Sequence, residues 1–158
     1  MDNNTAGERR IVIGVDGSQH SARAFQWLVK NMCNMETDRL LVVHAYEPPS
    51  MAVYPYAHGS AYYEAMQLSL KKDKKELEEL WQMYERKCKH YKLNYKLFKE
   101  ESCKPGEAIC KVANEEDAHF IVVGSRGCGT LRRTFLGSVS DYCLHHTHIP
   151  VAIIPPPS

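Results

Sequence analysis

One stretch of the sequence has the residue types and spacing of a binding site for anionic oxygens. Residues 124–140 read GSRGCGTLRRTFLGSVS; an apolar run (FIVV, 120–123) precedes them, and apolar residues at helical spacing begin at Val139. We therefore expect a buried strand, a glycine-containing loop and a helix start. The first N–H groups of a helix lack intrahelical partners and lie at the positive end of its dipole. The stretch predicts a phosphate site, with a plain strand-to-helix connection as the alternative.

Polar and cationic side chains in this stretch add to the prediction. Ser138 and Ser140 bring hydroxyl groups to the helix start, and Arg126, Arg132 and Arg133 bring positive charge. The serines could serve only as helix caps, and the arginines could be ordinary surface residues. Thr134 could also orient a phosphate.

Two familiar nucleotide motifs are excluded. No Gly-Lys-Ser/Thr triplet follows four spacer residues, so this is not a Walker A loop, and Gly127-Cys128-Gly129 is not completed by a third glycine, because Arg132 stands in its place. The spacing that is present is Gly-x2-Gly-x9-Gly-Ser, on Gly124, Gly127, Gly137 and Ser138.

The elements that must position this stretch follow from the hydrophobic pattern. Continuous apolar runs predict buried strands at 10–15, 40–45, 120–123 and 149–154, and an alternating run predicts an outer strand at 93–99. Helices are expected after a likely N-cap at Ser18, with apolar positions running to Met32, over about 61–90, from Pro105 to a point before Glu115, and from the stretch 137–140. This alternation predicts one α/β domain over 1–158, a doubly wound, Rossmann-like or flavodoxin-like five-stranded parallel sheet in the order 3-2-1-4-5.

That fold locates the pocket. In doubly wound sheets, ligands bind at the carboxyl ends of the strands where the winding reverses, here between the first and fourth strands. The two strand ends are Asp16-Gly17-Ser18 and residues 124–127. Asp16 could bind ribose, hold a magnesium ion through water, or only stabilise the turn into the next helix.

Composition excludes several classes of protein. A formal net charge of +1 gives no basis for nucleic-acid or membrane binding, and no apolar stretch has the length of a membrane span or a signal peptide. We expect a soluble, cytoplasmic protein with free thiols at its six cysteines. Residues 1–9 are expected to be disordered, and the Tyr- and Pro-rich segment 46–60 to form a long loop that covers the pocket, contacts a partner or has no role.

Other candidate chemistries fail on geometry. Adjacent histidines in His145-His146-Thr147-His148 point in different directions, so no metal site is expected there. Asp141 and His145 are one helical turn apart, which favours an ordinary ion pair over a catalytic dyad, and no G-x-S-x-G elbow accompanies Ser138. Cys128, between two glycines near Arg126, could have a redox role.

The chain resembles the ATP-binding class of the universal stress protein family. The resemblance rests on the glycine spacing above, on the strand ends Val15-Asp16-Gly17-Ser18 and Val42-Val43-His44-Ala45, and on the closing stretch 149–154. It implies an ATP-binding stress-response or signalling module with slow or no hydrolysis, and a homodimer formed through the last strand (150–154). The alternatives are a nucleotide-hydrolysing enzyme (an ATPase) and a nucleotide-free scaffold with the same fold.

The resemblance also implies which residues bind ATP, with or without Mg²⁺. Asp16 and its backbone neighbours would lie near the adenosine, Ala45 would border the adenine, and 123–127 would run beside the ribose and first phosphates. Residues 137–140 would hold the polyphosphate. The full set is Val15, Asp16, Ala45, Val123, Gly124, Arg126, Gly127, Gly137, Ser138, Val139 and Ser140; no catalytic residue or metal ligand is expected.

Overall fold

Every predicted strand and helix is present in the structure. The computed structural model describes residues 7–47, 59–125 and 137–157. The elements are β1 (Arg9–Gly14), α1 (Gln19–Asn31), β2 (Asp38–Tyr46), α2 (Ser60–His90), β3 (Asn94–Glu101), α3 (Pro105–Glu115), β4 (Phe120–Gly124), α4 (Ser138–His146) and β5 (Val151–Ile154). β1 begins inside the segment 1–9 that we expected to be disordered, and most of the loop predicted at 46–60 lies outside the described residues.

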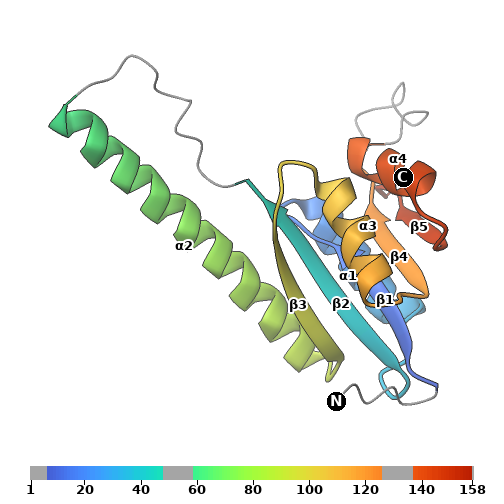
Figure 1. The fold of residues 1–158 in the computed structure, drawn as a ribbon. Helices are drawn as coiled ribbons and strands as arrows, with labels where there is room; N and C mark the ends of the chain where they lie inside the picture. The colour runs from blue at the N-terminus through green and yellow to red at the C-terminus, as the bar shows by residue number, and fades with distance from the viewer. Residues whose placement is uncertain (1–6, 48–58, 126–136, 158) are drawn as a thin grey trace.

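The five strands form one parallel sheet in the order β3-β2-β1-β4-β5, as predicted (Figure 1). β1 lies at the centre, and its residues Ile11, Val12 and Ile13 are completely buried. This is why its sequence is continuously apolar. β3 lies at an edge, where alternate residues face water, and this explains its alternating pattern.

Helices cover both faces of the sheet (Figure 1). Ile11 and Ile13 point to one face, where they pack with residues of α1 and α2 such as Phe25 and Tyr84. Val12 points to the opposite face and packs with residues of α3 and α4 such as Ile109. The reversal of winding between β1 and β4 follows from this arrangement.

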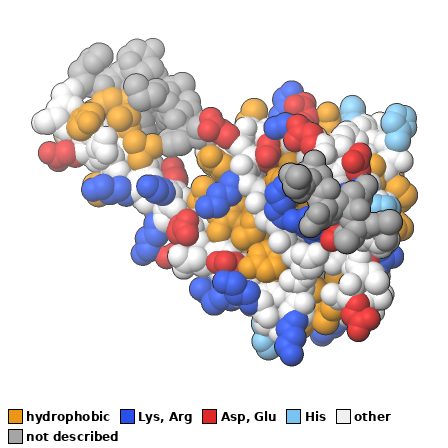
Figure 2. All heavy atoms as spheres, turned by 60° about the horizontal axis from the view of Figure 1, so that its bottom comes forward, with side chains coloured by type: hydrophobic (Ala, Val, Ile, Leu, Met, Phe, Trp, Pro, Cys, Tyr) orange, Lys and Arg blue, Asp and Glu red, His pale blue; other side chains and the backbone are white. Residues whose placement is uncertain are grey.

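Helix α2 is longer than the sheet that it covers. Its 31 residues span about 46 Å, whereas the eight residues of β3 span about 27 Å. Trp81, Tyr84 and Cys88 in its carboxyl-terminal half are buried. Its first half projects beyond the sheet (Figure 1). Tyr63 and Leu68 in this half are 60% and 67% exposed, and hydrophobic side chains are visible on the projecting part (Figure 2).

Candidate functional site

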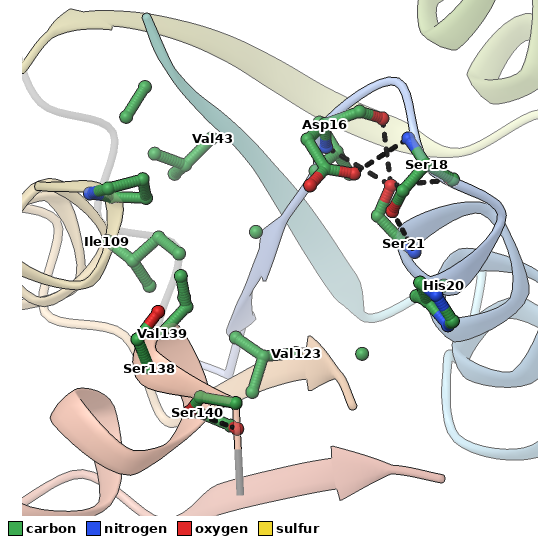
Figure 3. A pocket seen from close by; sticks show the side chains of 16 residues that line it. Asp16, Ser18, His20, Ser21, Val43, Ile109, Val123, Ser138, Val139 and Ser140 are labelled. Carbon is green, nitrogen blue, oxygen red and sulfur yellow. Dashed lines mark hydrogen bonds between the residues drawn. The ribbon is translucent and has the colours of Figure 1, made fainter. Parts of the chain in front are cut away.

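A cavity of about 320 Å³ opens at the carboxyl ends of β1, β2 and β4, where the sheet reverses its winding (Figure 3). Six segments contribute to its wall: the ends of these three strands and the first turns of α1, α3 and α4 bring their residues to the same place. The lining residues are Gly14, Val15, Asp16, Ser18, His20, Ser21, Val43, Ala45, Pro105, Ile109, Val123, Gly124, Gly137, Ser138, Val139 and Ser140. The predicted location of the pocket is therefore where the structure has a cavity.

The structure brings together nine of the predicted site residues. Val15, Asp16, Ala45, Val123, Gly124, Gly137, Ser138, Val139 and Ser140 all line the cavity. Arg126 and Gly127 lie outside the described residues, as do Cys128, Arg132, Arg133 and Thr134. That these residues contact a ligand stays a prediction.

Sequence reasoning placed Ser18 at the pocket, as part of the first strand end, but missed other lining residues that come from the helices and from the strands themselves. These are Gly14, His20, Ser21, Val43, Pro105 and Ile109. Gly14 and Val43 stand one or two residues before predicted site residues, so the strand ends could have indicated them. His20 is in the first turn of the helix that follows β1, a position that often faces such a pocket.

Side chains stabilise the first turn of α1. Ser18 is the N-cap, and its Oγ accepts the N–H of Ser21 at 3.3 Å, as predicted from sequence. The Asp16 carboxylate accepts the N–H of Ser18 at 2.8 Å, and the Ser21 hydroxyl donates to the Asp16 carbonyl oxygen at 2.8 Å. Figure 3 shows Asp16, Ser18 and Ser21 joined in this network. At least one role of Asp16 is therefore the structural one, which stabilises the turn into the helix.

The first turn of α4 is different because no side chain caps it. Its N-cap is Gly137, and the first intrahelical bond is from the N–H of Asp141 to the Gly137 carbonyl oxygen at 2.9 Å. The N–H groups of Ser138, Val139 and Ser140 precede that bond and so have no intrahelical acceptor. All three residues line the cavity. Within the described part of the chain, these backbone donors at the positive end of a helix dipole are therefore unpaired.

The serine hydroxyls of this turn are not equivalent. Ser140 is buried, and its Oγ donates to the Gly137 carbonyl oxygen at 2.9 Å. Its proton is therefore used within the helix, and only its lone pairs remain for other partners. Ser138 is exposed at the cavity edge and can donate its hydroxyl to a ligand.

Two glycines of the motif differ in whether the structure requires glycine at their position. A Cβ at Gly124 would lie 2.5 Å from the carbonyl oxygen of His20, so close packing of α1 against β4 requires glycine there. A Cβ at Gly137 would meet only the Ser140 Oγ at 3.7 Å, and the φ of Gly137 is −66°, which any residue can adopt. Neither conformation nor packing of the described residues requires glycine at 137. As far as those residues are concerned, the space beside it is open.

The titratable groups around the cavity are few. Asp16 is the only carboxylate among the described lining residues, and in the described part of the chain no three His, Cys, Asp or Glu side chains are grouped to hold a metal ion. His145 and Asp141 form the predicted ion pair at 3.5 Å.

The thiols of the described residues are free, and the one in α4 is unreactive. Cys33, Cys88, Cys103, Cys110 and Cys143 form no disulfide, as predicted. Burial raises the pKa of the Cys143 thiol to about 12, so this side chain is a neutral packing group behind the first turn of α4. No helix in the described ranges combines the length and apolar character needed to cross a bilayer.

Comparisons with known proteins agree with this geometry. A universal stress protein from Thermus aquaticus is 32% identical over 150 residues, which cover 92% of this chain and 98% of that protein. Universal stress protein Slr1101 of Synechocystis is 43% identical over 53 residues; this match covers 34% of the chain and about half (49%) of the relative. The crystal structure of an Arabidopsis thaliana universal stress protein family protein with AMP bound superposes with a TM-score of 0.67 at 22% identity, covering 95% of this chain and 93% of that one.

A protein-family model matches nearly the whole chain. The model of the universal stress protein family matches residues 8–155, from the start of β1 to just past the end of β5. The resemblance noted in the sequence is thereby confirmed: the chain belongs to the universal stress protein family.

Proposed function

We propose that the cavity binds an adenine nucleotide, with ATP as the native ligand and its phosphates at the first turn of α4. The observation that carries this is the uncapped α4 terminus, whose three leading N–H groups line the cavity beside a glycine that the fold does not require. The AMP bound to the Arabidopsis family member supports the adenine assignment. A magnesium ion would enter with the phosphates and not through a protein site of its own.

In this proposal the protein is a stress-response signalling module and not a dedicated enzyme. Hydrolysis of ATP needs a group that activates water beside the γ-phosphate. The one carboxylate of the described lining, Asp16, already accepts the N–H of Ser18, and it stands between β1 and α1 and not in the α4 turn. We expect phosphate release slower than a few turnovers per minute, and a faster rate would favour the ATPase alternative.

Calorimetric titration tests the binding proposal. Protein freed of copurified nucleotide is titrated with ATP, ADP, AMP and adenosine. Gly137→Val fills the open space beside the α4 turn, so we expect at least a 30-fold loss of ATP affinity, about 2 kcal/mol, with little change in stability. Leu144→Ala, on the exposed side of the same helix, is the matched control and should bind normally. No heat with any of these ligands would leave the nucleotide-free scaffold as the function.

We further propose that the module is a homodimer joined through β5. Among the described strands, β5 pairs only with β4, so it forms an edge of the sheet. The residues of this edge, Val151, Ala152 and Ile153, are apolar but only half-buried, which a second copy of the chain would change. Sedimentation of an Ile153→Lys chain is the test. The wild type should sediment as a dimer and the variant as a monomer at micromolar concentration; equal masses would remove this interface.

A further inference from the structure

Two residues of α1, His20 and Arg23, form a pair at the cavity that neither the glycine motif nor the family-based residue set includes. His20 lines the cavity from the first turn of the helix. Arg23 lies one turn further along, and its Nη2 is 3.2 Å from the Nδ1 of His20.

The chemistry of this contact fixes the state of the imidazole ring. A guanidinium group can only donate hydrogen bonds, so the Nδ1 of His20 must be the acceptor. An accepting Nδ1 requires the neutral ring with its proton on Nε2. No described residue accepts a hydrogen bond from Nε2, so the ring presents an unused N–H donor while it lines the cavity.

The position of the pair is set by the end of β4. Arg23 Nη2 also donates to the carbonyl oxygen of Ser125 at 3.5 Å, and the N–H of Ser125 donates to the Ile154 carbonyl oxygen at 2.8 Å. The close approach of Gly124 to the His20 backbone holds the same junction from the strand side. The pair therefore lies where the glycine motif begins, and Figure 3 shows His20 beyond Ser21 from Asp16.

Within the described part of the chain, no carboxylate neutralises the charge of Arg23. None forms a salt bridge with it, and its buried Nε has no hydrogen-bond partner there. A positive charge behind a neutral N–H donor strengthens that donor toward an anion. No Lys or Arg is among the described residues that line the cavity. The contact of Arg23 with His20 therefore brings a positive side-chain charge next to the cavity.

We propose that His20, oriented by Arg23, donates its Nε2–H to a phosphate oxygen of the bound nucleotide, so that α1 and α4 hold the phosphates from two sides. This rests on the proposed function, and it adds a phosphate-contacting residue (His20) and a positioning residue (Arg23). It predicts that the pair selects phosphorylated ligands over the free nucleoside.

The test compares ATP, AMP and adenosine on matched variants by calorimetry. His20→Ala should weaken ATP and AMP binding about tenfold, as expected for a hydrogen bond to a charged group, and leave adenosine binding unchanged. His20→Gln carries an amide donor at the end of its side chain and should recover most of the loss. Gln19→Ala, an exposed neighbour in the same turn, should match the wild type for all three ligands.

A spectroscopic readout separates a contact from a merely structural role. In ¹⁵N-histidine protein, with the His20 signals assigned by their absence in His20→Gln, Nε2 should be protonated and Nδ1 unprotonated, and AMP but not adenosine should shift Nε2. Arg23→Met should give a mixture of the two tautomers. The inference is overturned if His20→Ala weakens adenosine as much as ATP, if it weakens neither, or if AMP leaves the Nε2 signal unmoved. These results would leave the proposed nucleotide binding in place. A wild-type protein that binds no nucleotide would instead contradict both the proposed function and the role of His20.

Discussion

Helices α1 and α4 begin at the same cavity, yet their first turns are built differently. In α1 the Ser18 hydroxyl accepts the N–H of Ser21, and Asp16 accepts the N–H of Ser18. In α4 the N-cap is a glycine, and the hydroxyl of Ser140 turns back to the Gly137 carbonyl oxygen instead of capping an N–H group. Among the described residues, a side chain caps one leading N–H group of α1, and none caps a leading N–H group of α4.

The difference indicates which terminus is structural and which receives a ligand. Polar groups at helix ends are satisfied by side chains, by water or by ligands. In the proposed function, the capping side chain of α1 is used within the helix, and the contribution of α1 to binding would come from the side chain of His20. Because α4 keeps its leading N–H groups unpaired by side chains, its backbone is the part that an anion can contact.

The largest effect is expected from a substitution that pushes the first turn of α1 away from β4 and so changes the cavity wall. Gly124→Ala places a Cβ 2.5 Å from the His20 carbonyl oxygen, and backbone on both sides leaves little room to adjust. We expect a loss of about 3 kcal/mol in the free energy of unfolding, measured with urea, because overpacking of this kind is costly. Gly17→Ala, where a Cβ meets nothing within 4 Å, is the matched control and should change stability by less than about 0.5 kcal/mol. Equal stability of the two variants would show that α1 can move away from β4.

Converting the open terminus into a closed one is the most direct test of the comparison. Gly137 has the extended backbone of an N-cap (φ −66°, ψ 155°), so Gly137→Asp should cap α4 without strain. We expect stability to rise by a few tenths of a kcal/mol, and ATP affinity to fall by about 2 kcal/mol because a carboxylate takes the place of the phosphate. Urea unfolding and calorimetry on the same preparation measure both, and tight ATP binding by this variant would contradict an α4 phosphate site.

The smallest effect is expected from opening the closed terminus. Ser18→Ala removes the cap of α1, and should lower the free energy of unfolding by about 1 kcal/mol. ATP affinity should change less than threefold, because the lost hydroxyl serves the helix itself. A large loss of affinity with unchanged stability would mean that Ser18 contacts the ligand directly.

Much of the fold could be predicted because its elements have strong local signals. Continuous apolar runs identified the inner strands, alternation identified the edge strand β3, and Ser18 was recognisable as an N-cap. The start of α4 and the strand ends at Val15 and Val123 could be assigned to one pocket because parallel strands end on the same side of a sheet.

The missed residues depend on tertiary packing that a local pattern does not contain. Ile109 was correctly expected to face inward from α3, but whether an inward residue contacts the sheet or a cavity depends on where the helix crosses the strands. His20 was not predicted because its role depends on a contact with Arg23 and on the close approach of Gly124. The phosphate contacts expected of Arg126, Arg132 and Arg133 stay predictions, since these residues lie outside the described ones.

The contrast between Gly124 and Gly137 has a consequence for comparing related chains. The backbone of α1 fills the space where a side chain at 124 would go, so a descendant that stopped using nucleotide would still need glycine there. The position at 137 is under no such constraint from the described residues, and it would be free to acquire a larger side chain. A family member that keeps glycine at position 124 but has a larger residue at position 137 would therefore have kept the fold and lost the proposed nucleotide binding.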